Sequence, residues 1–185
     1  MADSAAPSAG QTTGRSRMVT GLFRDRESAE RAYNSMTTRG YSKDDVNLLM
    51  SDDTRKKYFA GDNVKDTELG TKAWEDAGKG AAIGGGVGAT LAAIAAIGTT
   101  VALPGLGLLV AGPLAAGILG AGAGGLTGGI IGALVGAGIP EERAELYEKG
   151  VHDGGIVMGV NAHNDEDAEY LENDWKNNRG EYVYR

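Results

Sequence analysis

Cysteine is absent from this chain of 185 residues. Its absence excludes a disulfide framework, a thiolate nucleophile and a cysteine-based metal site. Basic residues are also in a minority, with 18 Lys and Arg against 25 Asp and Glu, so the formal net charge is −7. Because nucleic-acid binding usually requires a basic face, this balance argues against a nucleic-acid partner.

A longer stretch, residues 80–140, lacks charge altogether. It contains no Asp, Glu, Lys, Arg or His, and its only polar side chains are threonines. It also holds 19 of the chain's 31 glycines. Glycine in a solvated helix costs up to about 1 kcal/mol relative to alanine. Helices in this tract therefore require close packing, or an apolar medium, to compensate.

Small residues recur at every fourth position of the tract, which places them nearly in line on one helix face. Such a face lets a second backbone approach closely, as in small-xxx-small packing. We therefore predict helix packing and self-association through two ladders. The first ladder is Gly80, Gly84, Gly88, Ala92 and Ala96, and the second is Gly112, Ala116, Gly120, Gly124, Gly128, Gly132 and Gly136.

A proline and two glycines, Pro104, Gly105 and Gly107, separate the ladders and predict the turn of a helical hairpin. The predicted helices, residues 80–102 and 113–138, would be about 34 Å and 39 Å long, enough to cross a bilayer core of about 30 Å. The first contains only six Leu, Ile or Val residues, so its predicted insertion is marginal. A water-soluble oligomer with the hairpins as its core is the alternative.

Trp74, Lys79 and Arg143 flank the tract. An interfacial aromatic ring and anchoring cations occupy such positions in membrane proteins. We predict these three residues as candidate interface anchors. Packing of Trp74 on a soluble domain is the alternative.

The charged flanks predict an α+β body with four strands, at residues 18–23, 46–50, 156–160 and 181–184. Asp25 and Gly40 bound one predicted helix, Pro140 opens a second, and Asp165 and Gly180 bound a third. Two βαβ units of this kind predict a ferredoxin-like split βαβ plan. The first and third strands would be central and the other two would be edges, with the hairpin projecting as an insertion.

The predicted organisation has five parts. These are a disordered tail (1–17), a first βαβ half (18–52), a polar connector with a helical lead-in (53–79), the glycine-zipper hairpin (80–139), and a helix with the second βαβ half (140–185). The tail lacks the apolar core of about 7–15 residues that a secretory signal needs. We therefore expect the body to be cytoplasmic.

No catalytic arrangement emerges from the sequence. Residues 120–125 fit G-x-G-x-x-G, but they do not follow a predicted strand and lack the acidic partner of a dinucleotide site. His152 and His163 are eleven positions apart and are more typical of surface residues than of a metal site. We predict a non-enzymatic protein without catalytic residues, cofactor or metal.

Seven short segments together form a distinctive sequence pattern. They are VTGLF (19–23), AERA (29–32), GYS (40–42), LPG (103–105), AGPL (111–114), GIPEERAELYEKGV (138–151) and GGIVM (154–158). Together, over about residues 18–160, they resemble the bacterial general stress or low-temperature-induced proteins, some of which are labelled predicted membrane proteins. The resemblance implies expression under heat, cold, osmotic or oxidative stress. It implies no catalytic residues.

The leading functional hypothesis is a non-enzymatic stress-response protein at the cell membrane. Its hairpin would insert into or associate with the lipid bilayer and bind other copies of the chain. The first alternative is a soluble, cytoplasmic homo-oligomer built on the hairpins. A weaker alternative is a small-molecule sensor that uses the ferredoxin-like body, and an apolar pocket between sheet and helices would favour it.

Overall fold

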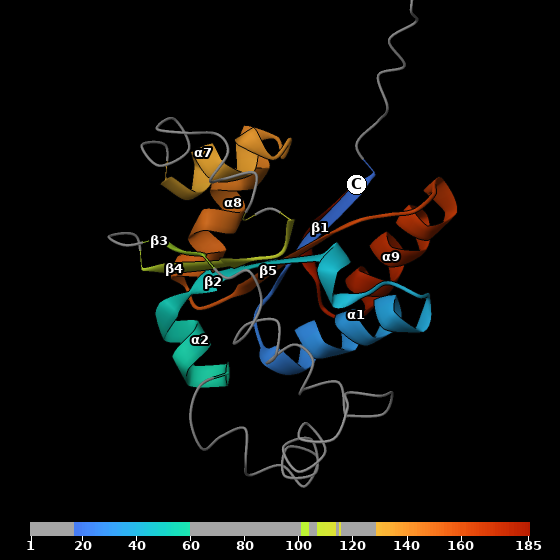
Figure 1. Cartoon of the computed structure of the whole chain (residues 1–185), viewed down its shortest axis with the longest axis horizontal. Coiled ribbons are helices and arrows are strands. Elements are labelled where there is room, and N and C mark those ends of the chain that lie inside the picture. Colours follow the sequence, from blue (N-terminus) through green and yellow to red (C-terminus); the bar gives the residue numbers. More distant parts are fainter. Residues whose placement is uncertain (1–16, 60–100, 104–106, 114, 116–128) are drawn as a thin grey trace, which may run out of the picture.

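The computed structural model describes residues 17–59, 101–103, 107–113, 115 and 129–185. In this part of the chain, one β-sheet lies between two layers of helices (Figure 1). Helices α1 (Arg26–Thr38) and α9 (Asp165–Asn177) cover one face. Helices α7 (Gly129–Gly136) and α8 (Glu141–His152) cover the other.

The sheet has six strands in the order β3-β4-β2-β5-β1-β6, and all neighbouring strands are antiparallel. Their bounds are Met18–Phe23 (β1), Val46–Ser51 (β2), Val101–Leu103 (β3), Leu108–Ala111 (β4), Ile156–Asn161 (β5) and Glu181–Tyr184 (β6). The mixed helix and strand composition confirms the predicted class. The strand order differs from the four-stranded plan because β3 and β4 extend the sheet beyond β2, which is therefore not an edge.

Helix ends agree with local signals where a side chain caps the backbone. The Asp25 carboxylate accepts a hydrogen bond from the backbone N–H of Ser28 at 2.8 Å, and Gly40 follows α1 with φ +89°. Pro140 precedes α8 as predicted.

The prediction for Asp165 is wrong, because Asn164 caps α9 by accepting from the Asp167 N–H at 2.7 Å. The end of α9 also differs, since the helix stops at Asn177 and the left-handed residue is Arg179, not Gly180.

Strands, not helices, flank the segment in which the sequence predicts the hairpin turn. Residues 101–103 and 108–111 form β3 and β4, which pair from Val101↔Val110 to Leu103↔Leu108, and β4 pairs with β2. The prediction of a helix up to residue 102 is therefore wrong at its C-terminal end, where the chain forms β3. The prediction that two helices lie directly on either side of the turn is wrong as well. A short apolar run bounded by Pro and Gly fits a buried strand as well as a helix segment. Here the pairing of β4 with β2 favours the strand over the helix.

The second predicted helix packs on the body at its described C-terminal end. Its described parts are helical at Pro113 and Ala115 and again over α7. Ile130, Ala133 and Leu134 of α7 are buried in the core formed with α8 and the sheet. Burying a Leu or Ile side chain contributes about 1.5–3 kcal/mol. This end of the uncharged tract is thus part of the folded body.

A helix, α2 (Asp52–Phe59), occupies the start of the predicted polar connector. The Ser51 hydroxyl accepts from the Thr54 N–H at 3.1 Å, and Lys56 pairs with Asp52 at 2.6 Å. Tyr58 packs against the core of the α1/α9 layer. The capping serine and the i,i+4 charge pair are local helix signals that the sequence analysis missed.

Gly112 shows how closely the tract is fitted to the sheet. It follows β4 with φ +90°, and a Cβ added there would lie 2.1 Å from the carbonyl oxygen of Val46 in β2. The position therefore requires glycine both for its left-handed backbone and for the contact with a neighbouring strand.

We predict that Gly112→Ala destabilises the protein by about 3 kcal/mol or more, because left-handed strain of about 1–2 kcal/mol adds to the overlap with Val46. Gly136→Ala is the matched control, since no atom of the described residues lies within 4 Å of an added Cβ at that position. Equilibrium denaturation of both variants measures the difference. Equal midpoints for the two would contradict this account of Gly112.

Candidate interaction surface

Helix α7 has an inner and an outer side. Its inner residues Ile130 and Leu134 are 3% and 1% exposed, whereas Val135 on the outer side is 42% exposed. Gly136 is exposed and Gly132 is half-buried. We call Gly132, Val135 and Gly136 the outer α7 face, because their i, i+3, i+4 spacing places them together on the helix. This face is uncharged and shallow, and a second helix or lipid chains could approach it closely.

Three members of the predicted ladders are described. Gly132 and Gly136 belong to the outer α7 face, whereas Gly112 contacts β2 and does not take part in helix packing as predicted. The other ladder members, Gly80, Gly84, Gly88, Ala92, Ala96, Ala116, Gly120, Gly124 and Gly128, lie outside the described residues. So do the turn residues Pro104 and Gly105 and the candidate anchors Trp74 and Lys79. Gly107 is described, with φ +61°, and its carbonyl oxygen accepts from the Asp52 N–H at 2.8 Å. Across the described residues, no helix is long and apolar enough to cross a membrane.

Arg143, the third candidate anchor, has partners within the chain. Its Nη1 donates to the carbonyl oxygen of Tyr182 at 3.3 Å, and its guanidinium lies 5.3 Å from the centre of the Tyr184 ring. The side chain therefore connects α8 to β6. A role for Arg143 at a membrane surface stays a prediction.

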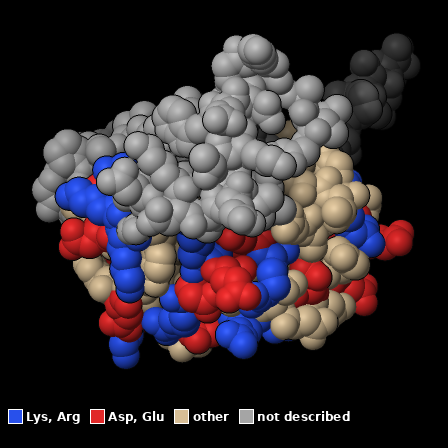
Figure 2. Space-filling model, turned by 90° about the horizontal axis from the view of Figure 1, so that it is seen from below, with Lys and Arg blue, Asp and Glu red and all other residues tan. Residues whose placement is uncertain are grey.

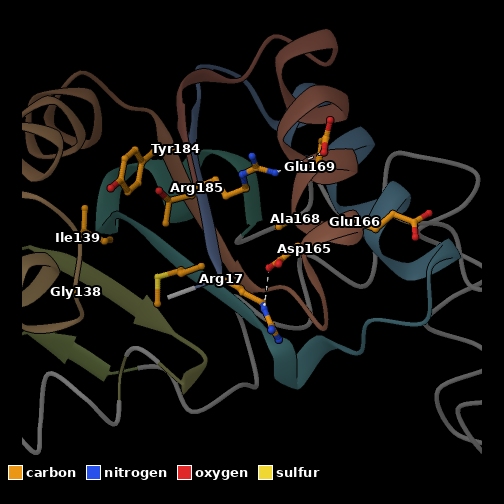
Figure 3. A pocket seen from close by; sticks show the side chains of 11 residues that line it. Arg17, Gly138, Ile139, Asp165, Glu166, Ala168, Glu169, Tyr184 and Arg185 are labelled. Atoms are coloured by element: carbon orange, nitrogen blue, oxygen red, sulfur yellow. Dashed lines mark hydrogen bonds and ion pairs between the residues drawn. The ribbon is translucent and has the colours of Figure 1, made fainter. Parts of the chain in front are cut away.

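A cavity of about 810 Å³ lies at one end of the sheet, where β1 begins and β6 ends (Figure 3). The charged side chains that line it largely pair with one another. Arg17 contacts Asp165 at 3.0 Å, and Arg185 lies 4.0 Å from Glu169. Exposed pairs of this kind contribute about 0–1 kcal/mol. The mixed lining does not concentrate charge of one sign, so it does not define a ligand class.

A much smaller cavity, of about 10 Å³, lies between the sheet and the α7 layer. Thr20, Asn47, Leu134 and Ile139 are among the residues that line it. A volume of about 10–15 Å³ holds at most one water molecule. This space is too small for a small-molecule ligand and does not favour the sensor hypothesis.

A polar network that the sequence analysis did not identify joins α1 to α9. The Tyr41 hydroxyl accepts from the His163 N–H at 2.9 Å and donates to Asp167 at 3.1 Å, and Arg39 also binds Asp167. The rings of Tyr41 and His163 stack with centres 4.1 Å apart. Tyr41 and Asp167 are 126 positions apart, so no local pattern connects them. Because these groups satisfy one another, the network is typical of a structural clamp.

Burial raises the pKa of the Tyr41 phenol, which therefore remains a hydrogen-bond donor at neutral pH. His152 lies at the end of α8, eleven positions before the His163 of this network. Within the described ranges, His, Cys, Asp and Glu side chains form no group of three or more that could hold a metal ion.

Acidic and basic side chains alternate over the described part of the face drawn in Figure 2. In the described helices, i,i+4 ion pairs include Glu27 with Arg31 at 2.6 Å and Lys176 with Glu172 at 2.6 Å. Such an arrangement is typical of a solvated helix surface.

No protein-family model, curated protein or solved structure matches this chain.

Proposed function

We propose that this chain is a non-enzymatic stress-response protein that associates with other copies of itself through its uncharged tract. The stress assignment depends on the resemblance described above. The self-association assignment depends on the outer α7 face, which points away from the core of its own chain.

We also propose a ferredoxin-like plan for the body beneath this surface. The four strands predicted from the sequence follow the order β2-β5-β1-β6, all antiparallel. Helix α1 connects β1 to β2 and α9 connects β5 to β6, and both helices pack on the same face. This arrangement supports the split βαβ plan. The tract then adds two strands and a helical layer to it.

Two properties suit the outer α7 face to helix contact. The inner side of α7 is fixed in the core, so the helix is already ordered. Binding of a partner to its outer side therefore loses little conformational entropy. Glycines at positions 132 and 136 let a second backbone come close. Since glycine in an exposed helix costs about 1 kcal/mol relative to alanine, a close contact explains its presence there.

The test is Gly136→Leu, which adds a large side chain to the outer α7 face at a position where no atom of the described residues lies within 4 Å of an added Cβ. We expect the folded monomer to be retained and the oligomer to dissociate at about tenfold higher protein concentration, a loss of about 1.4 kcal/mol. Analytical ultracentrifugation over a range of concentrations measures this shift.

Asn173→Leu is the matched control, because it adds the same side chain to an exposed position of α9 in the opposite layer. Its oligomer should equal that of the unmodified protein. An unchanged particle size for Gly136→Leu would remove this face from the interface. A monomeric unmodified protein at all concentrations would refute self-association.

Membrane association through the same tract is the second candidate function. The specific observation in its favour is the complete lack of charge over residues 80–140. We propose that the tract docks on or inserts into the bilayer while the body stays on the cytoplasmic side. The soluble oligomer and the membrane form would use the same uncharged surface, with lipid replacing the second copy.

An uncharged tract predicts vesicle binding that does not depend on anionic lipid or on salt. We expect equal flotation of the full chain with phosphatidylcholine vesicles and with vesicles containing phosphatidylserine, at low and at high ionic strength. Binding carried by basic residues would instead require phosphatidylserine and weaken with salt. If the chain stays at the bottom of the gradient with both vesicle types, the membrane proposal is wrong and the soluble assembly stands.

A further inference from the structure

The edge strand β6 is irregular at Tyr182. Its backbone there is left-handed, with φ +52°. Strand β6 pairs with β1 at Thr20↔Tyr184 and Leu22↔Glu181, with a register shift between these pairs. Two residues of β6 therefore lie opposite one residue of β1, which is the arrangement of a β-bulge. A left-handed aromatic residue is uncommon and persists only where its surroundings fix it.

Two side chains of α8 hold this backbone in place. The Tyr147 hydroxyl lies 2.8 Å from the carbonyl oxygen of Tyr182 and 2.9 Å from the Thr20 hydroxyl. Because a phenol has one hydrogen to donate, donation to the carbonyl leaves Thr20 as the donor to Tyr147. Arg143 donates to the same carbonyl at 3.3 Å. We call Tyr147, Arg143 and the Tyr182 carbonyl the Tyr182 latch.

The latch is stable to ordinary changes of pH. Tyr147 is 0% exposed, and burial raises its pKa to about 12. Its phenol therefore keeps the hydrogen that it donates.

The Tyr182 latch changes which backbone groups the edge of the sheet exposes to another strand. A regular edge strand offers a row of free N–H and C=O groups that another strand can pair with. In β6 the Tyr182 carbonyl is turned toward α8, and the backbone is kinked at the middle of a strand of four residues. A bulge at this place prevents a continuous ladder along the edge.

We propose that the Tyr182 latch keeps the β6 edge closed to a second copy of this chain, and that β6 pairs antiparallel with β6 of that copy when the latch is released. This interface would lie at the opposite edge of the sheet from β3 and would be independent of the outer α7 face.

The sequence of β6 selects a second copy as the partner. Residues 181–185 read EYVYR, so antiparallel pairing centred on Val183 places Glu181 opposite Arg185 and Tyr182 opposite Tyr184. Opposite charges and aromatic pairs across neighbouring strands are both favourable. Tyr182 and Tyr184 are 41% and 37% exposed, so their rings are available to a partner.

In the closed form these charges have partners within the chain. Glu181 binds Arg24 at 2.9 Å, and Arg185 lies 3.4 Å from Glu172. Both ion pairs are partly exposed and can exchange for the intermolecular pair without burying an unpaired charge.

The experiment compares two substitutions at one position, both in the full chain carrying Gly136→Leu. Tyr182→Thr introduces a β-branched residue, which disfavours a left-handed backbone, whereas Tyr182→Asn introduces a residue that accepts it. Both remove the aromatic ring. We expect self-association about tenfold tighter for the threonine variant than for the asparagine variant, measured by sedimentation.

Hydrogen exchange locates the contact. Backbone amides of β6 should become more protected as the concentration of the threonine variant rises, while those of the asparagine variant should not change. Equal association of the two variants would overturn the proposal, as would tighter association without added protection in β6.

Tyr147→Phe provides a second route to the same state if the threonine variant does not fold. It removes the hydroxyl that donates to Tyr182 and leaves the β6 sequence intact. Its control is Tyr33→Phe, which removes a phenol hydroxyl from a residue that is 2% exposed in the other helical layer. Association that increases for Tyr147→Phe alone supports the proposal, and equal behaviour of the two variants contradicts it.

Discussion

The structure depends on the need to cover two apolar faces of one sheet. Every residue of β1 except Met18 is buried, as is every residue of β2 except Ser51 and of β5 except Asn161. Consecutive residues of a strand point to opposite faces, so continuous burial demands a helical layer on each side. Helices α1 and α9 supply one layer. The other face depends on α8 together with the apolar side chains of the uncharged tract, which explains why α7 lies on the body.

The glycines of the tract serve different physical purposes despite their regular spacing. Gly112 accommodates the backbone of β2, where a side chain would overlap the Val46 carbonyl. Gly136 has open space around it and faces away from the core. A four-residue spacing alone does not distinguish these situations. The distinction matters for function, because only glycines that face outward from a fixed helix leave room for a second helix or for lipid.

Sequence reasoning succeeded where the determining interactions are local. Asp25, Gly40 and Pro140 act within one turn of the helices they bound, and the strand at residues 18–23 matches β1 in full. Apart from the local caps at Ser51 and Asn164, which it missed, it failed where distant residues decide. Val101 to Leu103 form a strand because β4 pairs with β2, a contact across more than fifty positions that periodicity does not reveal. The Tyr41–Asp167 network and the Tyr147 contact to β6 were missed for the same reason.

We propose that the uncharged tract associates with other copies of the chain, and such a protein must control which of its surfaces associate. The β6 edge is a second surface suited to association, because two exposed tyrosines flank Val183 there. Strand edges of this kind associate unless they are kinked, covered or charged. The left-handed Tyr182, tied to the buried hydroxyl of Tyr147, supplies such a kink at an edge that is otherwise suited to pairing with its own copy. In the proposed arrangement, closing this edge leaves the outer α7 face as the contact surface between copies.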